Sequence, residues 1–132
     1  MCVFCKIING EIPSFKIYET EDLVAFLDIS QATKGHTLIV PKKHFENLLA
    51  LDEETLKKIS VAQKEVANIL SKKLGTSAFN FVNNCGSVAG QSVMHVHFHI
   101  IPRYENDDFK MHIVEHVPNF EELAKLHKEI TE

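Results

Sequence analysis

The chain has 132 residues, of which 45% are hydrophobic and 24% charged, so it has the size and composition of one globular domain. Its net charge of -4 argues against a general nucleic-acid binder or a membrane-surface protein, because both classes are usually basic. No apolar stretch approaches the ~20 residues of a membrane-spanning helix, and no apolar leader follows Met1. The chain has three cysteines, an odd number that does not fit a secreted disulfide framework, so we expect a cytoplasmic protein.

The first part of the chain predicts a short helical turn followed by three strands. The turn covers residues 4–9, and Gly10 ends it. The apolar-rich runs 15–19 and 23–28 are separated by a charged turn, which is typical of a hairpin. Residues 37–40 predict a third strand, because a glycine precedes this apolar run and a proline follows it.

Apolar side chains recur at helical spacing over residues 53–74, which predicts one long helix. Asp52 suits the N-cap of this helix, and Gly75 suits the left-handed position after its last turn. A strand is expected at 78–83, and a second helix is expected to begin at Asn119.

Histidine occupies every second position from His95 to His99, and Val96 and Phe98 lie between. This period of two, with β-branched and aromatic residues between the histidines, predicts a strand at 96–101. A helix would place the first and last histidines of the run on one face, but Pro102 would cut that helix short. The sequence therefore predicts an α+β fold: a mostly antiparallel five-stranded sheet, one long central helix and a C-terminal helix.

The spacing of the three histidines limits what they can bind. Side chains on one face of a strand are ~6.6 Å apart, so His95 and His99 would be ~13 Å apart. They could not share one metal ion, whose bonds to nitrogen are only ~2.1 Å long. Each histidine is therefore expected to have a separate task. The preceding segment 83–92 combines two glycines with amide and hydroxyl side chains, which suits contact with an oxyanion.

The run from His95 to Ile101 resembles the H-φ-H-φ-H-φ-φ signature of the histidine-triad (HIT) nucleotide-binding proteins, in which φ is an apolar residue. Segments 26–44 and 84–92 are also similar to segments of that family. The resemblance extends over residues 2–104 of a chain that we expect to form a single domain, 1–132, with a tail and helix at 105–132.

The resemblance implies a reaction and the residues that perform it. His97 matches the nucleophile that attacks the α-phosphorus and becomes a transient nucleotidyl-histidine. His99 and His36 match the histidines that orient this nucleophile and help to move protons. Ser92 and Gln91 match residues beside the α-phosphate and the leaving group.

The resemblance also implies a nucleotide site. Asp28 matches the carboxylate that accepts the ribose hydroxyls, and Asn84 matches a ligand on the phosphate or ribose side. Four residues match the apolar pocket for the base: Phe4, Ile7, Phe26 and Ile29. Plain core packing is an equally good interpretation of these four, and Asp28 could also be an ordinary turn residue. Family members mainly bind purine nucleotides, are usually homodimers and commonly hydrolyse nucleoside phosphoramidates.

The C-x-x-C motif of Cys2 and Cys5 needs two further ligands to complete a tetrahedral metal site. The residues alone leave several candidates open: His44, His95, His112, His116 and Cys85. Some bacterial members of the resembling family hold a structural zinc with four ligands, and their positions match Cys2, Cys5, His44 and His95. His95 would then belong both to the histidine triad and to the zinc site.

Two other functions are kept as alternatives. A metal-dependent hydrolase would use a catalytic zinc shared by His95 and His97. A non-catalytic nucleotide-binding or adaptor protein would bind nucleotide without turnover. We expect a purine nucleotide ligand and no nucleic-acid or membrane partner.

Overall fold

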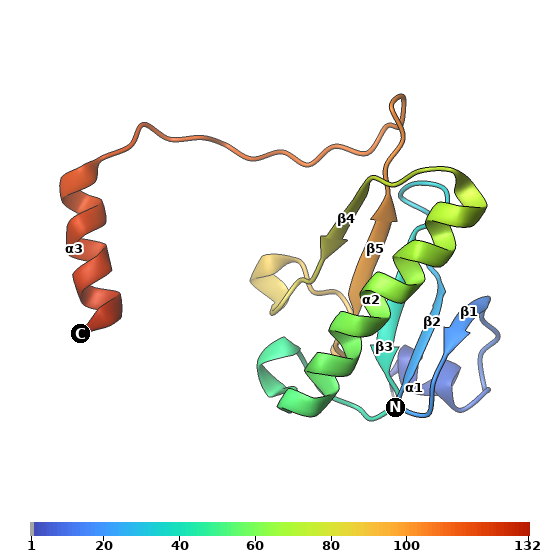
Figure 1. The fold of residues 1–132 in the computed structure, drawn as a ribbon. Helices are drawn as coiled ribbons and strands as arrows, with labels where there is room; N and C mark the ends of the chain where they lie inside the picture. The colour runs from blue at the N-terminus through green and yellow to red at the C-terminus, as the bar shows by residue number, and fades with distance from the viewer. Residues whose placement is uncertain (1) are drawn as a thin grey trace.

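The computed structural model describes residues 2–132 and confirms the α+β fold with a five-stranded antiparallel sheet (Figure 1). The strands lie in the order β1-β2-β3-β5-β4, and each neighbouring pair is antiparallel. Their bounds are Lys16–Glu19 for β1, Leu23–Leu27 for β2, Thr37–Pro41 for β3, Phe79–Val82 for β4 and Phe98–Pro102 for β5.

The long helix α2, Glu53–Leu74, has the bounds that the sequence predicts, because its end signals act locally. The Asp52 side chain accepts a hydrogen bond from the backbone N–H of Thr55, and Gly75 adopts the left-handed conformation at the C-cap. The other helices are α1, Val3–Ile8, and α3, Phe120–Thr131, with short 3₁₀ turns at Leu48–Ala50 and Ser87–Ala89. Asn119 caps α3 as expected.

Each face of the sheet is covered by a different helix. On one face, Ile59 and Val66 of α2 pack in the same cluster as Ala25, Ile39 and Ile100 of the sheet. Burying each such aliphatic side chain stabilises the fold by roughly 1.5–3 kcal/mol relative to exposure. Figure 1 shows α2 lying along this face.

The opposite face is covered by α1, whose Phe4 and Ile7 pack against Val24, Phe26 and Val40. Neighbouring residues of β2 belong to opposite clusters, as alternation along a strand requires. Every residue of β3 is buried, because this strand lies in the middle of a sheet that is covered on both sides. This position explains why Leu38, Ile39 and Val40 form an uninterrupted apolar run.

The strand predicted at 96–101 begins later than expected, at Phe98. Of the three histidines only His99 lies in β5. His95 and His97 lie before the strand, so the ~6.6 Å spacing expected along a strand does not apply to them. The physical reason is the lack of strand partners: β3 pairs with β5 only from Phe98 onward, and β4 has ended at Val82 opposite His99. The chain before β5 is held instead by a backbone hydrogen bond from Val96 to Phe45.

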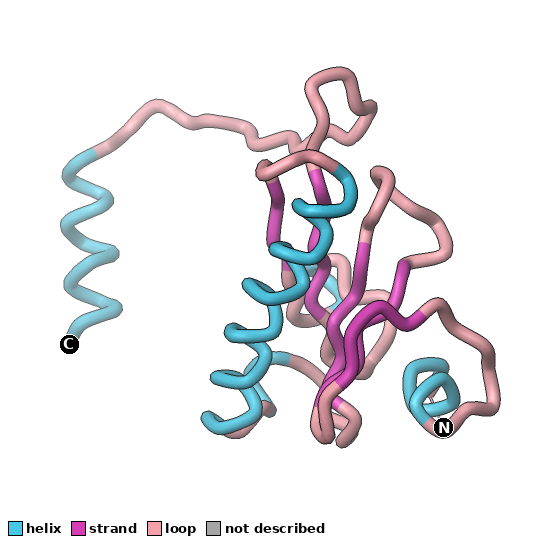
Figure 2. Tube along the Cα trace, turned by 45° about the vertical axis from the view of Figure 1, so that its right-hand side comes forward, coloured by secondary structure: helices cyan, strands magenta, loops and turns pink. Residues whose placement is uncertain are grey.

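The C-terminal arm, residues 108–132, stands apart from the rest of the chain. It runs as an extended segment that leads into α3, and Figures 1 and 2 both show α3 separated from the sheet and from α2. No residue of α3 is buried. One stripe of this helix is nevertheless apolar: Phe120, Leu123, Leu126 and Ile130.

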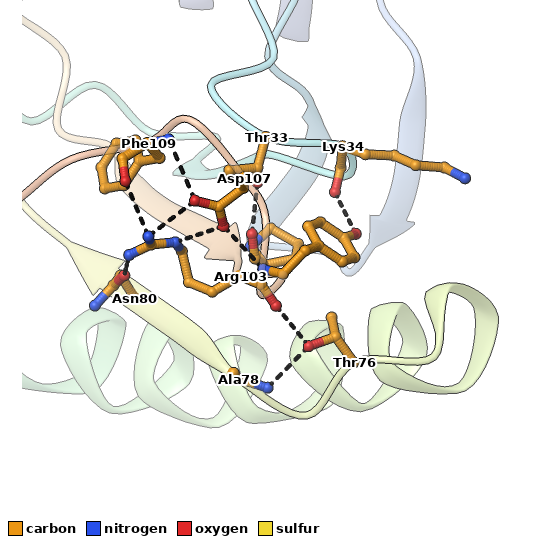
Figure 3. Close-up of polar contacts among 10 residues, drawn as sticks. Thr33, Lys34, Thr76, Ala78, Asn80, Arg103, Asp107 and Phe109 are labelled. Carbon is orange, nitrogen blue, oxygen red and sulfur yellow. Dashed lines mark hydrogen bonds and ion pairs between the residues drawn. The ribbon is translucent and has the colours of Figure 1, made fainter.

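A polar cluster around Arg103 fixes the point where the arm leaves the body (Figure 3). The guanidinium of Arg103 donates to both carboxylate oxygens of Asp107, at 2.9 and 3.0 Å, and to Oδ1 of Asn80 at 2.7 Å. It also donates to the carbonyl of Phe109 at 3.0 Å. The charged Arg103 partner holds the pKa of the Asp107 carboxyl well below its usual range. The start of the arm is thus tied to β4 and β5 and leaves in a defined direction.

Gly35 offers a direct test of the packing between the sheet and α2. It has a φ of +94°, and a Cβ added there would lie 2.5 Å from Cδ1 of Leu74 and 3.2 Å from Cγ of Pro102. Gly10 has a φ of +79° with open space around the same position. Both alanine substitutions carry the backbone cost of positive φ, but only Gly35→Ala also overpacks the core. We expect Gly35→Ala to lower the free energy of unfolding by about 1–3 kcal/mol more than Gly10→Ala, measured by denaturant titration. Equal losses would contradict the packing shown here.

Candidate functional site

Antiparallel pairing of β3 and β5 brings His36 and His99 together. His99 lies opposite Leu38 in the register, and His36 directly precedes β3. Nε2 of His36 lies 2.9 Å from Nδ1 of His99, so the two rings share a hydrogen bond. The ring centroid of His97 lies 5.2 Å from that of His99. The histidines of the sequence prediction therefore converge, although 63 positions separate His36 from His99.

The geometry around His97 determines which nitrogen carries its proton. Nδ1 of His97 lies 2.9 Å from the backbone carbonyl oxygen of His95. A carbonyl can only accept, so Nδ1 is the protonated nitrogen, and Nε2 of the neutral ring keeps its lone pair. The amide of Asn83 donates to the carbonyl of His97 at 3.0 Å and helps to hold this residue. The lone pair that a nucleophile needs therefore lies on Nε2 of His97.

The environment keeps the neighbouring histidines neutral. Burial lowers the pKa of His99 to about 4, and the nearby His97 and His36 add to this effect. Burial also lowers the pKa of His36, while the charge of Asp28 partly opposes the shift. Both rings are thus neutral near pH 7.

Asp28 is half-buried, with one carboxylate oxygen 3.7 Å from Nε2 of His36. Burial would raise the pKa of the Asp28 carboxyl, but hydrogen bonds from the hydroxyl and backbone N–H of Ser30 outweigh it and leave the pKa below its usual value. Asp28 therefore remains a carboxylate, the form that accepts hydrogen bonds from hydroxyl groups.

A cavity of about 240 Å³ lies beside these groups, between α1 and the sheet. The cavity is lined by the predicted ribose carboxylate, Asp28, and by the four residues predicted for the base, Phe4, Ile7, Phe26 and Ile29, but not by Asn84. Phe4, Ile7 and Phe26 are also core residues, so both sequence interpretations apply to them. Ile29 is 94% exposed and lies at the rim. The Phe4 ring centroid is 5.0 Å from that of His97, so one wall of the apolar cavity lies next to His97.

The loop before the histidines is braced by Gln91. Its amide nitrogen donates to the carbonyls of Glu46 and Val93, at 2.7 and 3.0 Å, and its oxygen accepts from the N–H of Gly86 at 2.8 Å. Gln91 is buried, so its amide holds the loop together from inside. Ser92 is exposed and Asn84 is half-buried, which leaves these two side chains better placed than Gln91 to meet a phosphate.

A second cluster contains the four residues predicted to bind a metal. Nδ1 of His95 lies 3.4 Å from Sγ of Cys2 and 3.5 Å from Sγ of Cys5. Nδ1 of His44 lies 3.7 and 3.4 Å from the same two sulfur atoms. The two Nδ1 atoms are 3.1 Å apart. Tetrahedral zinc with bonds of about 2.1–2.3 Å would separate its ligand atoms by about 3.4–3.8 Å. These residues therefore fit such an ion with little movement.

Contacts outside this second cluster orient its histidine ligand. Nε2 of His95 lies 2.8 Å from the carbonyl oxygen of Pro41, so Nε2 carries the proton and the lone pair of Nδ1 faces the thiols. Both nitrogens of His95 are thus engaged away from His97. The alternative in which His95 and His97 share a catalytic zinc finds no support in this arrangement.

Sequence reasoning assigned no task to Asn83 or Gln31, which contact the backbone of functional residues. Both side chains donate hydrogen bonds to backbone carbonyl groups of other residues. Which carbonyl group lies within reach depends on the fold, so the sequence does not show these contacts. The position of Asn83 directly before Asn84 was the one available signal for it. No described helix is long and apolar enough to cross a membrane.

Comparison with known proteins places the chain in a family. The HIT domain matches residues 9–106 of the chain. The adenosine 5′-monophosphoramidase of Saccharomyces cerevisiae is 41% identical over an alignment of 133 positions, which covers 98% of this chain and 80% of that protein. A solved structure from Streptococcus mutans superposes with a TM-score of 0.93 at 44% identity and covers 98% of this chain and 82% of that one.

A further solved structure, a zinc-bound histidine triad family protein from Mycobacterium smegmatis, superposes with a TM-score of 0.79 at 33% identity. It covers 97% of this chain and 96% of that one. The domain match and these similarities extend over the sheet, α2 and the histidine run. The chain therefore belongs to the HIT family.

Proposed function

We propose that this protein hydrolyses purine nucleoside phosphoramidates, or related nucleotidyl substrates, at the α-phosphate through a nucleotidyl intermediate on His97. The observation that carries the proposal is the hydrogen bond from Nδ1 of His97 to the backbone carbonyl of His95, which leaves the lone pair on Nε2 of a ring beside the apolar cavity. The yeast relative, an adenosine 5′-monophosphoramidase by name, supports the same chemical class.

The proposed reaction has two displacements. In the first, Nε2 of His97 forms a bond to the α-phosphorus while the bond from phosphorus to the leaving amine breaks and the amine takes up a proton. In the second, water attacks the phosphorus, releases His97 and yields the nucleoside monophosphate. Neutral imidazole suits both steps, because it is a nucleophile in the first and a leaving group in the second.

The surrounding residues would bind the substrate. Asp28 would accept hydrogen bonds from the ribose hydroxyls, since it is a carboxylate at the edge of the cavity. Phe4 and Phe26 would contact the base through their rings, which are 5.7 Å apart at the centroids. Ser92 and Asn84 would lie on the phosphate side. An apolar cavity of this kind selects a ring shape more strongly than the pattern of polar atoms on the base.

We also propose that Cys2, Cys5, His44 and His95 bind one structural zinc ion. The close approach of two Nδ1 atoms and two sulfur atoms supports this, because one ligand atom from each of the four residues lies near the others, as in a tetrahedral zinc site. The zinc-bound relative from Mycobacterium smegmatis adds support from the family. The ion would tie α1 to the segment before β5, which steadies Phe4 beside the nucleophile. Reduced cysteines are needed for such a site, in keeping with the predicted cytoplasmic location.

We further propose that the protein is a homodimer in which each C-terminal arm crosses to the second copy. β4 is an edge strand, and a groove of about 390 Å³ lies between it and α2, lined partly by Phe79 and by Phe81, which is 49% exposed. The arm passes this edge of the sheet on its way to α3 (Figure 1). Its apolar stripe needs a partner, since an isolated helix of 12 residues is marginally stable in water.

The superposition with the Streptococcus mutans structure supports this arrangement of the arm. The arm makes up about a fifth of the chain. The TM-score of 0.93 covers 98% of the chain and so includes the arm. A score this high supports a similar course of the arm in that protein. A shared course for a segment with no buried helix residue indicates that contacts outside the chain hold it, and a second copy is the partner that is always present.

The first prediction concerns the nucleophile. His97→Ala should lower turnover of adenosine phosphoramidates by several orders of magnitude, because no other group can form the covalent intermediate. Nucleotide binding should persist, since the cavity and Asp28 remain. Steady-state kinetics and calorimetric titration with AMP measure the two effects. Lys125→Ala, on the face of α3 opposite its apolar stripe, serves as the control.

Added imidazole should partly restore turnover to His97→Gly. Near wild-type turnover in His97→Ala would rule out the covalent mechanism. Binding without turnover in the wild-type protein, across phosphoramidates, dinucleoside polyphosphates and nucleotide sugars, would favour the adaptor function instead.

The second prediction concerns zinc. The purified protein should carry about one zinc per chain by elemental analysis. The double variant Cys2→Ser with Cys5→Ser should lose the metal, melt at a lower temperature and bind nucleotide more weakly, whereas the single-turnover rate at saturating substrate should change little. Cys85→Ser, which removes the cysteine outside the cluster, should keep the metal.

Protein prepared without chelators and found free of metal would defeat the zinc proposal. A single-turnover rate that collapses on metal removal while the fold stays intact would instead favour the catalytic-zinc hydrolase.

The third prediction concerns the arm. Unlabelled and ¹⁵N-labelled chains, refolded together, should give cross-links between Lys125 or Lys128 and lysines of the body that join one labelled and one unlabelled chain. Leu123→Glu, in the apolar stripe, should reduce these cross-links strongly, because it places a charge in the contact. Lys125→Glu, on the opposite face of α3, should leave the Lys128 cross-links in place. Cross-links confined to chains of one label, or a native mass of a single chain, would contradict the exchange.

A further inference from the structure

The segment from Asp28 to His36, which connects β2 to β3, contains a residue whose function neither the histidine run nor the nucleotide cavity explains. Gln31 has a φ of +42° and is the one non-glycine residue within 2–132 that has a positive φ. Such a conformation is unfavourable for a side chain with a Cβ unless surrounding contacts hold it. The structure supplies these contacts through the Gln31 amide.

The Gln31 amide spans the whole segment. Its nitrogen donates to the carbonyl oxygens of Asp28 and His36, both at 2.7 Å, and its oxygen accepts from the N–H of Gly35 at 2.8 Å. This arrangement requires one planar group that donates two hydrogen bonds and accepts one. Glutamine provides them, whereas a glutamate of the same shape would set a carboxylate oxygen against two carbonyl oxygens.

The closed segment directs the backbone N–H of Ala32 toward the imidazole ring of His36. The N–H of Ala32, next to Gln31, lies 3.1 Å from Nδ1 of His36. A backbone N–H can only donate, so Nδ1 of His36 must accept and carries no proton. The neutral ring of His36 then has its proton on Nε2.

The tautomer of His36 in turn determines the tautomer of His99. Nε2–H of His36 faces Nδ1 of His99 at 2.9 Å and donates to it. Nδ1 of His99 is therefore an acceptor, and the proton of the neutral His99 ring lies on Nε2. The same protons argue against a metal ion among Asp28, His36 and His99, whose ligand atoms are otherwise close enough for one. A metal at this point would need the nitrogen that carries the His36 proton.

We propose that Gln31 is a positioning residue for nucleotidyl transfer: by closing the segment from Asp28 to His36 it sets the tautomers of His36 and His99, so that His99 offers Nε2–H to the substrate. This inference rests on the proposed function for its kinetic consequence. Its structural part, the pair of fixed tautomers, stands independently of any substrate. Gln31 acts through other residues and does not itself contact the reacting atoms.

Two variants separate the amide from the backbone turn. Gln31→Glu keeps the shape of the side chain but loses both donated hydrogen bonds. Gln31→Gly removes the side chain while favouring the positive φ, so a loss in this variant is not caused by a strained turn. Lys34→Gln changes an exposed side chain of the same segment and is the matched control; only its backbone carbonyl makes a contact, with the hydroxyl of Tyr104 (Figure 3).

Nitrogen chemical shifts of ¹⁵N-labelled histidine report the tautomers directly. In the wild-type protein and in Lys34→Gln, both His36 and His99 should be protonated at Nε2 and unprotonated at Nδ1. In Gln31→Glu and Gln31→Gly, His36 should shift toward protonation at Nδ1. The same two variants should lose roughly 10²-fold in kcat, within the range of acid–base contributions, while KM stays close to the wild-type value.

The outcomes distinguish this inference from the proposed function. Unchanged tautomers in folded Gln31→Gly, or wild-type kcat in both variants, would overturn the positioning role. Tautomers that shift as expected in a protein without any nucleotidyl turnover would support the structural part of the inference and refute the proposed function.

Discussion

His95 connects the two chemical sites of this protein, and the arrangement of both depends on its contacts. The side chain is fully buried, its Nε2 donates to the carbonyl of Pro41 at the end of β3, and its Nδ1 faces the thiols of Cys2 and Cys5. Its backbone carbonyl accepts from Nδ1 of His97. One residue thus anchors the N-terminal helix to the sheet and sets the tautomer of the candidate nucleophile. Because its Nε2, its Nδ1 and its carbonyl oxygen face different partners, His95 connects the candidate metal site with the candidate nucleophile.

Backbone carbonyl and N–H groups determine the proton positions at this site. Carbonyl oxygens only accept and backbone N–H groups only donate, so each neutral ring that contacts one of them is limited to a single tautomer. Backbone groups fix the tautomer at any pH near neutrality, because they do not change their own protonation as a carboxylate can. Burial completes the effect by disfavouring the charged imidazolium, which keeps His36 and His99 neutral. A set of neutral rings with fixed protons is suited to nucleophilic substitution near pH 7.

The candidate site residues and the C-terminal arm belong to different parts of the chain. Every candidate site residue lies before Arg103, in the part of the chain where the sheet, α1 and α2 form two apolar clusters. Arg103 and Asp107 then close a polar turn, after which the chain no longer buries its own residues. The apolar stripe of α3 is not buried within this copy, in keeping with the homodimer proposed above, whereas the candidate nucleophile and its neighbours are assembled within one copy.

The sequence by itself determined the features that depend on near neighbours. Asp52 and Gly75 set the ends of α2 through bonds within one helical turn, and the alternation of histidine with apolar residues indicated extended chain near β5. The histidine run also sufficed to indicate the family. Tertiary structure alone decided where β5 begins, because strand pairing needs partners that are remote in sequence. It also decided which interpretation applied to Phe4 and Phe26, which are both core and cavity residues, and which nitrogen of each histidine carries the proton. The positions of these protons depend on carbonyl and N–H groups brought into reach by folding, and those groups are the same in every residue, so no side-chain pattern reveals them.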